Sequence, residues 1–108
     1  MPSKITATDI IKINKILGYS PINQNLVGSC LSSMDYLDST KLKISSIVRG
    51  IVKNHAFRDG NKRTAVLVYY TLCYRNKIKP ISDRDMFNIV LEIANNNYTI
   101  EQTSSKLF

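Results

Sequence analysis

The stretch HAFRDGNKRTAVLVYYTLCY, residues 55–74, joins a charged segment to a run of almost entirely apolar residues. Its first half places the single histidine of the chain, His55, close to an aspartate, an asparagine and three cations. Its second half is apolar on nearly every side, which is typical of a helix buried inside a bundle. We therefore predict a short loop that leads into a buried helix, which runs from Asn61 or Lys62 to about Arg75.

Apolar residues repeat at helical spacing in four further segments, and polar residues at the ends of these segments can cap them. We expect a first helix capped by Thr8, and a second capped by Ser39 or Thr40 that ends near Asn54 or His55. We expect a further helix capped by Ser82, and a last one capped by Thr99 with Gln102. The inner side of the helix capped by Ser82 should carry Met86, Phe87, Val90, Leu91 and Ala94. A loop over 19–31 and a helical turn around 34–37 complete the pattern. The predicted fold class is all-α, a compact bundle of five or six helices around a buried central helix, in a single domain over residues 1–108.

The composition argues against several classes of protein. Apolar residues make up 44% of the chain and charged residues 21%, as in an ordinary globular protein. The sequence has no apolar run long enough for a membrane span and no apolar signal core near its start. Cys30 and Cys73 are isolated from each other and fit neither a metal site nor a disulfide framework. We expect a cytoplasmic protein with reduced cysteines, in which Cys73 belongs to the core.

The net charge of +7 favours polyanionic partners, such as nucleotides, nucleic acid or an acidic protein. Most of the lysines are scattered along the chain, so a solvated basic surface is an equally good interpretation. A basic module that binds nucleic acid should expose aromatic rings for stacking on bases. Tyr69, Tyr70 and Tyr74 lie in the apolar run and are expected in the core, so no direct contact with nucleic acid is expected.

The start of the predicted buried helix has the features of an anion site. The first N–H groups of a helix have no partner within the helix and carry the positive end of its dipole. Gly60 would let an oxyanion approach the backbone, and Lys62 and Arg63 add full charges. Asp59 could hold Mg²⁺ together with substrate phosphates, and His55 could accept a proton near neutral pH. Alone, these features are more typical of helix capping and surface charge than of a binding site.

Residues 55–65, HAFRDGNKRTA, resemble the signature loop of the Fic/Doc family. The Fic pattern is H-x-F-x-[DE]-G-N-G-R-x-x-R, and the Doc branch reads H-x-F-x-D-[AG]-N-K-R-T-A. The chain fits the Doc form at every specified position. The resemblance covers residues 35–108 well and 1–34 loosely, and it implies a Fic fold in which the loop 19–31 corresponds best to the flap of the family.

By position, the resemblance assigns roles to seven residues in or near this loop. His55 would be the general base, Asp59 the Mg²⁺ ligand, Gly60, Asn61 and Lys62 the anion hole, Arg63 a phosphate ligand, and Lys53 a counterpart of an arginine that can help bind phosphate in Doc-type chains. Lys62 and Arg63 would also neutralise charge during the reaction. The implied cofactors are ATP and Mg²⁺.

Two departures from the Fic form indicate which reaction to expect. Fic enzymes that transfer AMP have glycine in place of Lys62 and a second arginine in place of Val66. In the Doc branch these changes accompany ATP bound in the opposite sense, with its γ-phosphoryl group facing the target. The resemblance therefore implies a toxin, a protein kinase that phosphorylates a threonine of elongation factor Tu and stops translation. The alternatives are AMP or nucleotide transfer of the Fic type, and a basic binding module without catalysis.

Regulation should come from a second protein. Self-inhibiting members of the family carry the motif [ST]-x-x-x-E-[GN], and neither Glu92 nor Glu101 stands in it. The resemblance therefore implies a cognate antitoxin similar to Phd. The basic surface would suit an acidic, partly disordered antitoxin tail that folds when it binds.

Overall fold

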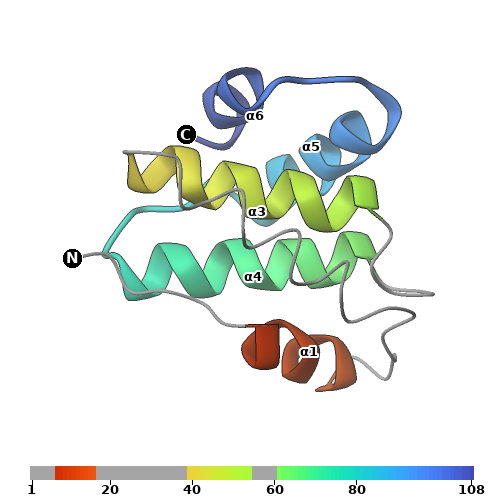
Figure 1. The fold of residues 1–108 in the computed structure, drawn as a ribbon. Helices are drawn as coiled ribbons and strands as arrows, with labels where there is room; N and C mark the ends of the chain where they lie inside the picture. Colours follow the sequence, from red (N-terminus) through yellow and green to blue (C-terminus); the bar gives the residue numbers. More distant parts are fainter. Residues whose placement is uncertain (1–6, 17–38, 55–60) are drawn as a thin grey trace.

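The computed structural model describes residues 7–16, 39–54 and 61–108, and within these ranges it contains helices and no strands. In chain order the helices are α1 (Ala7–Ile16), α3 (Thr40–Asn54), α4 (Asn61–Arg75), α5 (Asp83–Asn95) and α6 (Ile100–Leu107) (Figure 1). The predicted all-α class is confirmed. The loop 19–31, expected to be the flap, and the turn expected at 34–37 lie outside the described residues, as does the complete helix count.

Helices α3 and α4 lie side by side in opposite directions and form the centre of the bundle (Figure 1). Helix α1 packs against α4, whereas α5 and α6 pack against α3, and α5 also contacts α4. The buried apolar side chains that join these helices are Ile10 of α1; Ile44, Ile47, Val48, Ile51 and Val52 of α3; Ala65, Val68, Tyr69, Leu72 and Cys73 of α4; Met86, Ile89, Val90 and Ile93 of α5; and Leu107 of α6. The core therefore sits between the two central helices and their neighbours, with Cys73 inside it as predicted. In the ranges that the structure describes, no helix is both long and apolar enough to cross a membrane.

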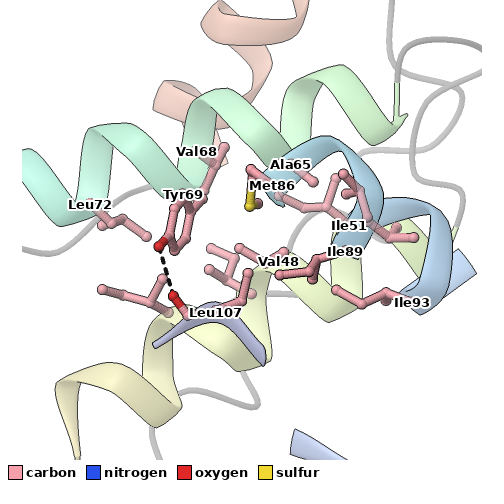
Figure 2. Close-up of a cluster of buried hydrophobic side chains, with 14 of the residues drawn as sticks. Val48, Ile51, Ala65, Val68, Tyr69, Leu72, Met86, Ile89, Ile93 and Leu107 are labelled. Atoms are coloured by element: carbon pink, nitrogen blue, oxygen red, sulfur yellow. Dashed lines mark hydrogen bonds between the residues drawn. The ribbon is translucent and has the colours of Figure 1, made fainter. Parts of the chain in front are cut away.

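The hydroxyl of Tyr69 joins the C-terminal half of α4 to two other parts of the fold by hydrogen bonds. This buried hydroxyl donates to the Leu107 carbonyl at 2.8 Å (Figure 2). It also accepts from the Ile81 N–H at 3.1 Å. The neighbouring Tyr70 hydroxyl donates to the Ile81 carbonyl at 3.1 Å. Burial raises the pKa of Tyr69 to about 12, because a phenolate is poorly solvated in the core. This half of α4 is therefore held by polar contacts as well as by apolar packing.

The predicted caps of three helices are confirmed. Ser39 accepts from the Leu42 N–H at 3.4 Å, Ser82 accepts from the Asp85 N–H at 3.3 Å, and Thr99 and Gln102 each accept from the backbone N–H of the other at 3.1 and 2.9 Å. At α1 the prediction was wrong, because the helix begins at Ala7 and Thr8 lies within it. Local side-chain chemistry thus sets the starts of α3, α5 and α6.

The inner face of α5 differs from the predicted one. Met86, Ile89, Val90 and Ile93 are buried, whereas Phe87 is 63% exposed and Leu91 is exposed as well. The buried residues follow the spacing of one helical face, and Phe87 and Leu91 each lie one position further along the chain. Both were wrongly expected to be core residues.

Helix α4 is not buried on every side, which corrects a second expectation. Leu67 is exposed, and Tyr74 is 87% exposed although it stands in the apolar run. The two residues are seven positions apart and therefore share one face of the helix, together with Arg63 four positions before Leu67. Tyr69 is buried and Tyr70 half-buried, so only part of the tyrosine cluster belongs to the core.

Candidate active site

The central helix pair brings both sides of the signature stretch to the same end of the bundle. Helix α3 ends at Asn54 and α4 begins at Asn61, and these two ends lie next to each other (Figure 1). Three of the predicted site residues lie outside the described residues: His55, Asp59 and Gly60. Their roles as base, Mg²⁺ ligand and anion-hole residue remain predictions.

The first turn of α4 has a buried side and an outward side. Thr64 and Ala65 are fully buried, and they anchor the start of the helix against the core. Asn61 is half-buried, whereas Lys62 and Arg63 are exposed. Packing of the buried side therefore presents two cationic side chains to the solvent at a helix N-terminus.

The charge at this helix start runs against the usual preference. Acidic residues stabilise the first turn of a helix because they face the positive end of its dipole. Helix α5 follows this preference with Asp83 and Asp85, and α6 follows it with Glu101, but α4 has no acidic residue in its first turn. Helix α3 also lacks an acidic residue in its first turn. The cation in that turn, Lys41, has its ammonium group 5.7 Å from the centre of the Phe108 ring. Two cations on the positive end of α4 create a site that favours a bound anion.

Lys53 lies at the contact between α3 and α5. Its Nζ donates to the Ala94 carbonyl at 3.4 Å, in the last turn of α5, where the helix dipole is negative. One turn earlier on α3, the Arg49 Nε donates to the Tyr98 carbonyl at 2.6 Å. These two contacts fix α3 to the segment around the end of α5. The predicted role of Lys53 in phosphate binding stays a prediction.

Val66 occupies the position at which the Fic pattern has its second arginine. Its side chain is half-buried and packs against the hydrophobic core. Arg63, three positions earlier, is exposed. The start of α4 therefore offers a lysine next to one arginine, rather than two arginines one turn apart.

The residues at the start of α4 fit a phosphate group. A guanidinium can hold two phosphate oxygens, and an ammonium adds a point charge beside it. Within the described part of the chain, no group of three or more His, Cys, Asp or Glu side chains could hold a metal ion. A Mg²⁺ ion held by one carboxylate and substrate phosphates requires no such group, so Asp59 stays the predicted ligand.

A second set of residues, to which no sequence motif assigns a role, lies at the other end of α4. Tyr74, Lys77 and Lys79 line a common surface groove there. Tyr74 belonged to the apolar run, and cations just beyond the end of a helix are ordinary. The periodicity of the sequence therefore carried no signal that these three side chains share a surface.

A comparison with models of known protein families matches residues 16–73 to the Fic/DOC family. The matched segment is more than half of the chain and contains α3, residues 55–65 and most of α4. The match does not separate the Doc branch from the rest of the family. A search of curated proteins found no match. The chain therefore belongs to the Fic/Doc family, and this membership implies a transferase that acts on proteins.

Proposed function

We propose that this protein is a kinase toxin of the Doc type, which transfers the γ-phosphoryl group of ATP to a threonine hydroxyl of elongation factor Tu and so blocks protein synthesis. The observation that carries the proposal is the first turn of α4. In a chain of the Fic/Doc family, this turn presents Lys62 and Arg63 at a helix N-terminus and itself contains no acidic residue.

Two features of α4 favour phosphoryl transfer over AMP transfer. The Lys62 side chain adds bulk and charge where AMP-transferring members have glycine, next to the predicted anion hole. Val66 packs against the core, where those members have a second arginine that clamps the far phosphates. A site changed in both ways would bind ATP with its γ-phosphoryl group toward the target hydroxyl.

In the proposed reaction, the threonine Oγ forms a bond to the γ-phosphorus, while the bond from this phosphorus to the β–γ bridging oxygen breaks and ADP leaves. The proton of the hydroxyl passes to the imidazole of His55. Arg63, Lys62 and the backbone N–H groups from Gly60 onward stabilise the charge on the phosphoryl oxygens, and the amide of Asn61 is a further phosphate ligand. When bound by Asp59 and the phosphates, Mg²⁺ would neutralise part of the triphosphate charge.

The proposed setting is the cytoplasm, where elongation factor Tu is the substrate and a cognate antitoxin similar to Phd restrains the enzyme. The formal net charge of +7 supports an acidic partner of this kind. Neither Glu92 of α5 nor Glu101 of α6 stands in the inhibitory motif of self-restrained family members.

The test uses purified protein, Mg²⁺, elongation factor Tu and ATP labelled at either the γ- or the α-phosphate. We expect label on the factor from γ-labelled ATP alone, and its loss in His55→Ala. Arg84→Ala changes an exposed arginine of α5 and serves as a matched control that should label as well as the unchanged chain. Label from α-labelled ATP would identify an AMP transferase, and no label from either would favour the binding module.

A further inference from the structure

A surface groove lies at the end of α4 opposite to the proposed phosphate-binding turn. Its volume is about 640 Å³, and it runs from the last turns of α4 into the following segment. The rings of Tyr70 and Tyr74 contribute apolar surface together with Ile78 and Pro80. Tyr74 is 87% exposed, so most of its ring surface is open to a partner.

The turn that closes α4 places a lysine where glycine is normally preferred. The Ile78 N–H donates to the Cys73 carbonyl at 2.9 Å, and the Lys77 N–H donates to the Tyr74 carbonyl at 3.3 Å. These two bonds define a Schellman turn, in which the residue at the position of Lys77 adopts a left-handed conformation. Lys77 has a φ of 57°, which costs a residue with a Cβ more than it costs glycine. The turn therefore presents the Lys77 side chain at a cost to the backbone.

Among the described residues that line the groove, the charged ones are cations. These are Lys77 and Lys79, and none of the described lining residues carries a carboxylate. The nearby Asp83 acts on the Tyr70 hydroxyl, where it helps burial to raise the pKa of that tyrosine. An apolar floor flanked by two ammonium groups is complementary to an apolar side chain flanked by carboxylates.

We propose that this groove binds an acidic peptide segment, with an apolar side chain of the peptide packed on Tyr74 and Ile78 and neighbouring carboxylates paired with Lys77 and Lys79. A protein segment fits better than single-stranded nucleic acid, which needs several open rings along a track of cations. Tyr74 is open, but Tyr70 is half-buried and its hydroxyl is bound to the Ile81 carbonyl. The inference does not depend on the proposed kinase activity.

The test measures the fluorescence anisotropy of a fluorescein-labelled peptide of alternating glutamate and leucine, mixed with the full chain. The double variant Lys77→Glu/Lys79→Glu should weaken binding about tenfold or more, and Tyr74→Ala should weaken it by a similar factor. The double variant Lys12→Glu/Lys15→Glu makes the same change in net charge at exposed sites of α1. It should alter the affinity by less than about twofold, because distant surface charges are screened.

Lys77→Gly separates the role of the side chain in binding from its role in the fold, because glycine suits the backbone of the turn and removes the whole lysine side chain, cation included. It should weaken peptide binding while the chain stays folded, as judged by circular dichroism. Equal binding of a peptide with glutamine in place of glutamate would overturn the proposal, as would equal losses in the α1 control. Tighter binding of a labelled oligothymidine that is lost in Lys77→Glu/Lys79→Glu would also overturn it, in favour of a nucleic-acid site. Labelling of elongation factor Tu reports separately on the kinase proposal.

Discussion

Exposed cations stand at both ends of α4, but in opposite physical settings. Lys62 and Arg63 lie at the positive end of the helix dipole, where they disfavour the helix. Lys77 follows the negative end, where its charge is favourable but its backbone conformation is not. The stability of α4 alone explains neither the two cations in its first turn nor the left-handed conformation of Lys77. Substitutions at the two ends should therefore change binding and catalysis more than they change folding, in contrast to substitutions in the middle of the helix.

The largest effect is expected at the first end, for Arg63→Ala. Loss of a positioned charge on a transferring phosphoryl group should lower kcat/KM for labelling of elongation factor Tu by about 100- to 1,000-fold. The free energy of unfolding should change by less than about 1 kcal/mol, because the side chain is exposed. Single-turnover labelling and urea unfolding measure the two quantities. Arg63→Lys should recover only part of the activity, since a lysine cannot hold two oxygens in the same plane. A large loss of stability with normal activity would contradict this assignment.

The second-largest effect is expected for a substitution in the middle of α4. Tyr69→Phe removes the hydroxyl that binds the Leu107 carbonyl and the Ile81 N–H, so both groups lose a partner in or near the core. The free energy of unfolding should fall by about 1–3 kcal/mol in urea titrations, with labelling activity retained. Tyr74→Phe makes the same chemical change at an exposed ring and should alter stability by less than about 0.5 kcal/mol. Equal effects of the two substitutions would show that the buried hydroxyl does not join the helices.

The same hydroxyl predicts how stability depends on pH. The pKa of Tyr69 is raised to about 12 in the folded state, whereas an exposed tyrosine in the unfolded chain titrates near 10. Below pH 10 the hydroxyl is protonated in both states and contributes no pH dependence. Between pH 10 and 12 only the unfolded chain releases this proton, so the free energy of unfolding should fall by about 1.4 kcal/mol per pH unit. Urea titrations at several pH values should show a shallower fall in Tyr69→Phe, and an unchanged slope would contradict the prediction.

The sequence predicted those features of the fold that depend on contacts between residues close together in the chain. Ser82 and Thr99 cap α5 and α6 as their spacing from Asp85 and Gln102 indicates, because a cap is a contact within one turn. The burial of α5 was less predictable. Its apolar residues cover more than one face of the helix, so the pattern allowed Phe87 to point inward until packing against α3 and α4 decided otherwise.

In the candidate site too, features within a short stretch of sequence were predictable, whereas contacts between residues far apart in the chain were not. Residues 55–65 form a contiguous motif, so the sequence alone identified the family that the comparison then confirmed. The bond from Lys53 to the Ala94 carbonyl joins residues 41 positions apart, and no local pattern reveals it. Exposure of Tyr74 likewise depends on where the other helices end, which an apolar run does not encode.

The smallest expected effect, and the only gain in stability, belongs to the far end of α4. Lys77→Gly should raise the free energy of unfolding by about 0.5–1 kcal/mol in urea titrations, because glycine adopts the left-handed conformation at φ 57° without a clash involving Cβ. Lys79→Gly is the matched control, since it removes a lysine of the same groove at a residue without a positive φ and should bring no gain. A loss of stability in Lys77→Gly would mean that contacts of the lysine side chain outweigh its backbone cost. A gain in the free energy of unfolding would set Lys77 apart from Tyr69. The chain should be less stable without the Tyr69 hydroxyl, whereas it would be more stable without the Lys77 side chain that the turn presents to the groove.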